Sequence, residues 1–141
     1  MSRLSVPEFQ NLIDQELPLV RLFGIQTESI ADGGAVLRMR FNPDLIRPGG
    51  TIAGPALMAL ADATLYAVVL GMIGRVELAV TTSLNINFLR KPPPADVIAE
   101  GRILKLGKRL AVGEVLLLSA ELEEAVAHVT GTYSIPPLSG T

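Results

Sequence analysis

The chain has 141 residues, of which 49% are hydrophobic and 18% are charged, a composition that predicts one folded domain and excludes a disordered chain. Its net charge of −2 and the lack of an extended basic segment argue against nucleic acid as the main partner. Cysteine is absent, which excludes disulfides, thiolate metal sites and a cysteine nucleophile and leads us to expect a cytoplasmic protein.

The first third of the chain predicts a helix, two strands and a loop, at residues 6–17, 24–31, 35–41 and 42–53. The helical pattern is amphipathic, Ser5 can cap its start, and Pro18 ends it. The residues Asp32-Gly33-Gly34 form a turn between the two strands. The loop is rich in proline and glycine.

The longest apolar run, residues 54–73, predicts a helix that begins at about Pro55 and ends at Gly74. The run is nominally long enough to cross a membrane, but its one ionisable residue, Asp62, lies near its middle, where a charge is costly. Amphipathic strand patterns flank the run, so we interpret it as a fully buried helix. A carboxylate in such a helix loses hydration and needs a partner or a function.

Four strands are expected in the second half, at residues 78–89, 96–105, 110–120 and 125–135. Short connections predict an antiparallel meander, and alternation places Thr81 and Ser83 on one polar face of the first strand. The domain is therefore of the α+β class. A sheet covers only one side of a helix, so we expect a second copy on the other side, in a homodimer or homotetramer. Residues 136–141 should form a loose tail.

Two motifs then give a family resemblance. The segment 47–55, RPGGTIAGP, followed by Leu60-Ala61-Asp62, resembles the signature of the PaaI-like hotdog thioesterases of phenylacetate degradation. The segment 80–90 resembles the T-x-x-L-x-I-x-F-L-R strand of that family, and the likeness covers about residues 20–135. It implies a single hotdog domain, in which a curved antiparallel sheet of about six strands wraps around a long central helix.

The resemblance also implies an activity, the hydrolysis of a small to medium acyl- or aryl-CoA thioester. Asp62 would be the general base or nucleophile, and Gly54 N–H would hold the carbonyl oxygen as it becomes negative. A helix start offers such unpaired N–H groups, and Pro55 carries none. Thr81 corresponds to a hydroxyl that the family takes from the partner subunit, with Ser83 beside it. No cofactor and no metal would be needed, and CoA would be part of the substrate.

Three positions differ from the signature. Arg47 stands where the family has asparagine, Ala53 where it has histidine, and Pro55 where it has a second glycine. Arg47 could replace the lost amide as a charged donor to the carbonyl. These changes also favour an alternative, a non-catalytic module that binds acyl-CoA or an aryl ligand.

The remaining charged residues allow two interpretations. Arg90 and Arg109, with the lysines near them, are either a solvated rim or a binding site for the phosphates of CoA. His128, the one histidine, alternates with polar residues and is interpreted as an ordinary strand residue. A single histidine far from Asp62 argues against serine triads and against the hydratase chemistry known on this fold.

Overall fold

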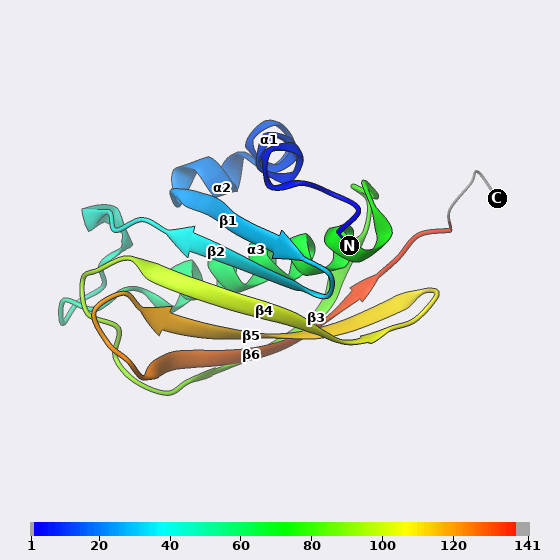
Figure 1. Cartoon of the computed structure of the whole chain (residues 1–141). Coiled ribbons are helices and arrows are strands. Elements are labelled where there is room, and N and C mark those ends of the chain that lie inside the picture. The colour runs from blue at the N-terminus through cyan, green and yellow to red at the C-terminus, as the bar shows by residue number, and fades with distance from the viewer. Residues whose placement is uncertain (1, 138–141) are drawn as a thin grey trace.

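The structure, a computed structural model, describes residues 2–137, so residues 138–141 of the expected tail lie outside it. Two short helices and a β-hairpin precede one long helix, and four further strands follow (Figure 1). The helices are α1 (Val6–Glu16), α2 (Pro18–Leu22), the 3₁₀ turn η1 (Pro43–Leu45) and α3 (Gly54–Ile73). The strands are β1 (Ile25–Ala31), β2 (Gly34–Met39), β3 (Val80–Phe88), β4 (Val97–Leu106), β5 (Leu110–Ser119) and β6 (Ala125–Ser134).

The expected N-terminal helix is confirmed as α1, and α2 is an element that the sequence pattern did not predict. Ser5 and Glu8 form a capping box: Glu8 N–H donates to Ser5 Oγ (3.2 Å), and Ser5 N–H donates to the Glu8 carboxylate (2.9 Å). Pro18 ends α1 as expected, but its fixed φ also suits the first turn of α2. The second helix buries Val20 in the core.

All six strands form one antiparallel sheet in the order β1-β2-β4-β5-β6-β3. The expected meander is confirmed for β4, β5 and β6 but is wrong for β3, which pairs with β6 instead of β4. The linker 89–96 contains three consecutive prolines, which cannot donate to a strand ladder, so no tight β3–β4 hairpin forms. As a result, β3 is an edge strand of the sheet (Figure 1).

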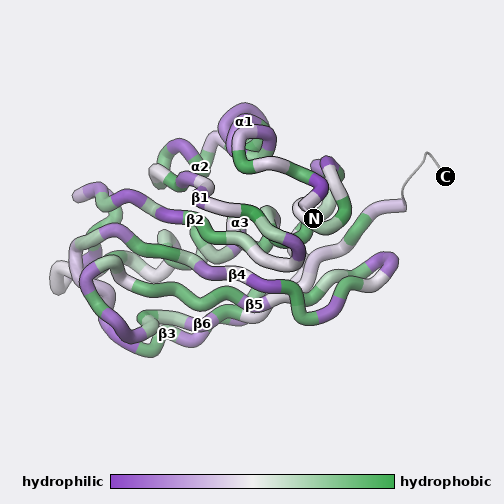
Figure 2. The backbone as a smooth tube through the Cα atoms, in the orientation of Figure 1, coloured by the Kyte–Doolittle hydropathy of each residue, from purple (hydrophilic) through white to green (hydrophobic). Residues whose placement is uncertain are grey.

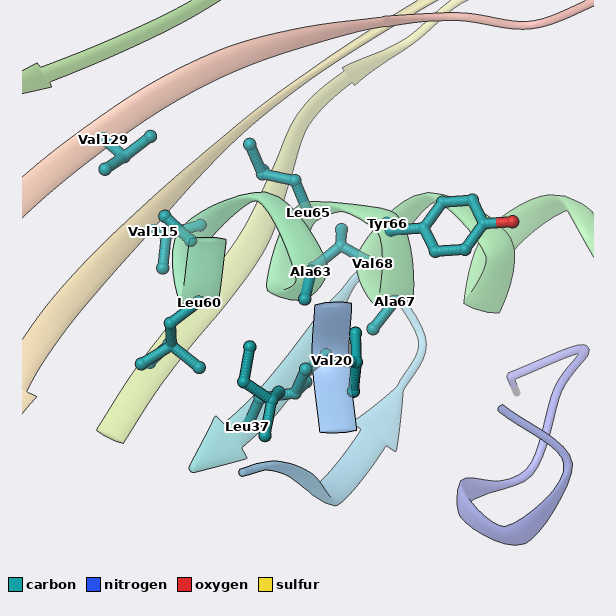
Figure 3. Packing of buried hydrophobic residues seen from close by; sticks show 14 of the residues in the cluster. Val20, Leu37, Leu60, Ala63, Leu65, Tyr66, Ala67, Val68, Val115 and Val129 are labelled. Atoms are coloured by element: carbon teal, nitrogen blue, oxygen red, sulfur yellow. The ribbon is translucent and has the colours of Figure 1, made fainter. Parts of the chain in front are cut away.

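Helix α3 lies against one face of the sheet and forms a single core with it. Figure 3 shows Val115 of β5 and Val129 of β6 on one side of α3. On the other side it shows Leu37 of β2, another strand of the same sheet, and Val20 of α2. The strands alternate between hydrophobic and hydrophilic residues, and the β4–β5 turn is hydrophilic (Figure 2). The α+β prediction, with a long central helix and a six-stranded antiparallel sheet, is confirmed.

Glycines on neighbouring strands allow α3 to approach the sheet closely. A Cβ atom added to Gly131 would lie 2.5 Å from Leu65 Cδ1, and one added to Gly113 would lie 2.8 Å from Leu65 Cδ2. The two glycines are paired across β5 and β6, so together they form a shallow site for Leu65. This contact fixes the height of the helix over the sheet.

Helix α3 has the length and apolar composition of a membrane span, but 72% of its most apolar window is buried inside the fold. It is therefore a buried core helix, as the sequence predicts. One stripe is less covered: Pro55 and Met58 are exposed, and Ala59 and Asp62 are partly exposed. These positions recur every three or four residues and so lie on one side of the helix.

The two edges of the sheet differ. On β1, the Gln10 side chain accepts a hydrogen bond from Thr27 N–H (2.7 Å) and donates to the Ile25 carbonyl (3.4 Å), which closes that edge. Among the described residues, β3 pairs only with β6, and its other edge is free. At its two ends, Val80 and Phe88 are 57% and 54% exposed, so this unpaired edge carries an exposed apolar side chain at each end.

Candidate active site

Asp62 is held by two hydroxyl groups of its own chain. Thr81 Oγ1 donates a hydrogen bond to Asp62 Oδ1 (2.5 Å), and the Tyr133 phenol donates to the same oxygen (2.9 Å). The carboxylate is partly exposed on the open stripe of α3. The expectation of an enclosed charge is therefore corrected: Asp62 keeps access to solvent and has the donors that stabilise a carboxylate.

The expectation that Thr81 reaches Asp62 from a partner subunit is wrong, because the contact forms within one chain. A β-bulge in β3 produces it. Thr81 lies opposite Tyr133 and Ser83 lies opposite Thr132, so Thr82 is the extra residue. Tyr133 is buried against α3, and Thr132, its neighbour on β6, is on the other face.

The same bulge corrects the prediction for Ser83. Simple alternation placed Ser83 on one face with Thr81, but its pairing with Thr132 places it on the outer face of the sheet, where it is exposed. Ser83 is thus not part of the Asp62 site. The bulge had no glycine or proline to mark it in the sequence.

An apolar cavity of about 370 Å³ lies beside Asp62. Its walls come from α3, from Leu17 and helix α2, from residues 77–81 at the entrance to β3, and from β6. The lining residues are Leu17, Leu19, Val20, Ala59, Asp62, Ala63, Tyr66, Glu77, Leu78, Ala79, Val80, Thr81 and Tyr133. Among the described residues that line it, the ionisable ones other than tyrosine are two acids, Asp62 and Glu77, and none is a cation.

Gly54 begins α3 at a second cavity. Ala53 caps the helix without a side-chain hydrogen bond, and among the described residues no acceptor meets the Gly54 N–H. The Phe88 ring packs over this glycine, since an added Cβ would lie 3.2 Å from Phe88 Cζ. The cavity has about 380 Å³, and its lining residues are Arg47, Thr51, Ile52, Gly54, Leu57, Phe88, Leu89, Arg90, Lys91 and Pro92. Arg47 and Gly54 are therefore brought together.

Gly54 and Asp62 are too far apart to act on one carbonyl group within one chain. They are eight positions apart on α3, and a rise of about 1.5 Å per residue separates them by about 12 Å along the helix axis. A donor and an attacking group must both lie at about 3 Å from the reacting atoms. Within one chain, therefore, Asp62 and the Gly54 N–H do not form a single site.

Arg90 and Arg109 do not form one cluster. Arg90 lies just after β3, where it pairs with the Glu124 carboxylate and donates to the Ala125 carbonyl (2.7 Å). Arg109 precedes Leu110, which pairs with Ser134 at the opposite end of the sheet. Arg90 lines the Gly54 cavity, and Arg109 lines neither that cavity nor the Asp62 cavity.

His128 and Tyr66 make hydrogen bonds outside the Asp62 carboxylate. His128 is on the outer face, as expected for an ordinary strand residue, and its Nε2 is 2.9 Å from Glu114 Oε1. Hydrogen bonds from His128 and Arg102 hold the pKa of Glu114 below its usual value. Tyr66 donates to the Glu77 carbonyl (2.9 Å) instead of to Asp62, four positions earlier.

Tyr133 is the site residue that the sequence reading missed. It lies 71 positions after Asp62 and reaches it because β6 neighbours the bulged end of β3. A tyrosine in an alternating strand is ordinary, so no local pattern marks it. Its role depends on the strand order.

Comparisons with known proteins agree with this geometry. Residues 49–126 match the thioesterase superfamily. A putative thioesterase from a Silicibacter species superposes with a TM-score of 0.88 at 38% identity, covering 97% of this chain and 95% of that chain. A variant of the phenylacetic acid degradation protein PaaI from Thermus thermophilus gives 0.76 at 27% identity, covering 84% and 99%. A putative esterase of Saccharolobus solfataricus is 34% identical over 79% of this chain and 73% of that protein. The chain therefore belongs to the thioesterase superfamily, as a PaaI-like thioester hydrolase with the hotdog fold.

Proposed function

We propose that the protein hydrolyses acyl-CoA thioesters, with Asp62 as the general base or nucleophile and Gly54 N–H as the oxyanion donor. The observation that carries this proposal is the unequal use of the two Asp62 oxygens. Oδ1 accepts both hydroxyl hydrogen bonds, no described residue donates a hydrogen bond to Oδ2, and Asp62 lines the apolar cavity. A fixed carboxylate with one free oxygen can activate water or attack a carbonyl carbon.

In the general-base route, water and the thioester are the only reactants. Asp62 takes one proton from water, and the water oxygen forms a bond to the thioester carbon. The carbonyl oxygen becomes an oxyanion, which the Gly54 N–H and the positive end of the α3 dipole stabilise. The C–S bond then breaks, and the departing thiolate takes the proton from Asp62. In the nucleophile route, an Asp62 oxygen bonds to the thioester carbon, the C–S bond breaks and the thiolate leaves. Water then hydrolyses the resulting anhydride, which restores the Asp62 carboxylate, and a proton from that water goes to the thiolate.

The complete site needs two copies of the chain. The free β3 edge supports an antiparallel pairing of β3 with β3 of a second copy, which brings the Val80 end of one strand beside the Phe88 end of the other. Thr81 and Asp62 belong to the Val80 end, and Gly54 lies under Phe88. A homodimer of this kind joins Asp62 of one copy to Gly54 of the partner subunit.

The Asp62 cavity supports a neutral, apolar acyl group as the substrate. Its volume of about 370 Å³ is in the range of ligand pockets. Leu19 and Leu78 supply aliphatic walls. The carboxylates of Asp62 and Glu77 would repel an acyl chain that itself ends in a carboxylate. The small to medium acyl or aryl chains of our first expectation fit this description.

The CoA portion would then lie on the Gly54 side. Arg47 and Arg90 line that cavity and supply positive charge for phosphate groups or the carbonyl oxygen. Arg109 lies at the Val80 end of the sheet, so the proposed dimer brings it to the same side as Gly54 of the partner subunit. We place the enzyme in the cytoplasm, because CoA thioesters are made and used inside cells.

The test compares the wild type with Asp62→Asn on short, medium and aromatic acyl-CoA thioesters, by following the release of free thiol. Turnover by the wild type that falls by about 10²-fold or more in the variant supports the proposal. Glu123→Gln, a surface change in the β5–β6 turn, is the control for loss of one acid. Tight binding of these thioesters without turnover would instead support the alternative, a binding module in which Arg47 and Ala53 have replaced the signature residues.

A further inference from the structure

Tyr133 contacts Asp62 at two atoms. Its phenol oxygen lies 2.9 Å from Asp62 Oδ1 and 3.0 Å from the backbone carbonyl oxygen of the same residue, so the single phenol proton is shared between them. A donor that reaches both the main chain and the side chain of one residue restricts the rotation of that side chain relative to its own helix.

Tyr133 is itself rigidly placed. It is 3% exposed, and its ring stacks on the Tyr66 ring with centroids 6.1 Å apart. Burial raises the pKa of the Tyr133 phenol well above its usual value, and the Asp62 charge raises it further. The phenol therefore stays protonated and remains a donor at neutral pH.

Core packing alone does not explain this hydroxyl group. A phenylalanine would fill the same volume against Tyr66, and a buried hydroxyl is retained at a cost unless it is hydrogen-bonded. The bonds that repay this cost both go to Asp62, one to its backbone carbonyl and one to its carboxylate, which lines the cavity.

We propose, on the basis of the function proposed above, that Tyr133 is a positioning residue which fixes Asp62 so that Oδ2 faces the thioester. Thr81 and Tyr133 hold Oδ1 from two neighbouring strands, β3 and β6. With both donors in place, the carboxylate has one free oxygen in one orientation. With Thr81 alone, the carboxylate can rotate about its bond to Cβ, and both oxygens compete for the reacting position.

The experiment compares kcat and KM of the wild type, Tyr133→Phe and Tyr66→Phe, together with their thermal unfolding. Tyr66 is the matched comparison, because it is the stacked partner and its hydroxyl bonds to the Glu77 carbonyl. We expect Tyr133→Phe to lower kcat by about tenfold or more with KM nearly unchanged. Tyr66→Phe should lose clearly less kcat, and any effect it has should fall on KM through the acyl cavity.

Three results would overturn the inference. The first is a Tyr133→Phe enzyme with the wild-type kcat. The second is an equal loss in both tyrosine variants that follows their loss of thermal stability, since this would indicate packing alone. The third result would come from crystal structures. We expect the Asp62 side chain to have one orientation in the wild type and more than one in Tyr133→Phe. One unchanged orientation would contradict the inference. Because the structures do not depend on turnover, an inactive wild type would count against the proposed function only.

Discussion

Gly54 and Asp62 lie on the same helix, yet they line different cavities, one near each end of strand β3. Helix geometry keeps them about 12 Å apart along the axis. The bulge in β3 gives Asp62 its Thr81 partner, and Phe88 at the other end of the same strand covers Gly54. One strand therefore contacts both residues, and in the proposed function the active site depends on how two such strands meet.

Removing the Gly54 N–H should lower turnover far more than adding volume at the same position. Gly54→Pro deletes the donor, whereas Gly54→Ala keeps it and adds a Cβ that would lie 3.2 Å from Phe88 Cζ, so the ring must shift slightly. We expect kcat of Gly54→Pro to be about 10²-fold or more below that of Gly54→Ala. Thiol release measures both. Equal activity of the two variants would mean that another group holds the oxyanion.

The bulge in β3 predicts that two neighbouring hydroxyl residues differ in importance. Thr81→Val removes a donor to Asp62 Oδ1 and should lower kcat by about tenfold. Ser83→Ala changes the exposed outer face and should keep the wild-type kcat. If Ser83→Ala lost as much activity as Thr81→Val, the strand would alternate without a bulge, and the register described here would be wrong.

The fold followed from the sequence to the extent that its elements are local. Periodicity located α1, α3 and the strands, because each pattern lies within one element. The neighbour of β3 could not be predicted in this way, since a proline linker allows β4 to leave the edge and pair with β2. The candidate site likewise has residues that local motifs predict and residues that depend on the strand order. The motifs indicated Asp62 and Gly54, but Tyr133 and the position of Ser83 depend on strand order and on a bulge.

The charge of the acyl cavity predicts a preference among substrates. Asp62 and Glu77 supply carboxylates to this cavity, and none of its described lining residues is a cation. The cavity should therefore accept a neutral acyl chain better than a chain of equal length that ends in a carboxylate. We expect kcat/KM to differ by about tenfold or more, since a carboxylate in an apolar site has lost its hydration. Equal kcat/KM for the two thioesters would show that the chain end does not enter this cavity.

The two tyrosines predict how stability changes at alkaline pH. Burial raises the pKa of Tyr133, with a further contribution from Asp62, and burial also raises the pKa of Tyr66. In the unfolded chain both ionise near their ordinary value of about 10. The folded state holds these protons more tightly, so this stabilisation is complete below about pH 10 and is lost as pH rises further.

Ultraviolet absorbance of tyrosinate measures this difference directly. At about pH 10, where the chain in concentrated guanidinium chloride is half ionised, the folded protein should show clearly less tyrosinate. The urea midpoint should fall over the same range. Ionisation of the folded protein at the ordinary pKa would contradict the buried positions of Tyr66 and Tyr133.

The central claim, that each site joins Asp62 of one copy to Gly54 of the partner subunit, is tested most directly by mixing two inactive chains. Asp62→Asn and Gly54→Pro are each expected to be nearly inactive alone. When they are unfolded together and refolded, half of the dimers contain one of each chain, and each of these has one intact site. The mixture should therefore recover about a quarter of the wild-type thiol release. Activity no greater than the sum of the two parents would contradict a site shared between subunits.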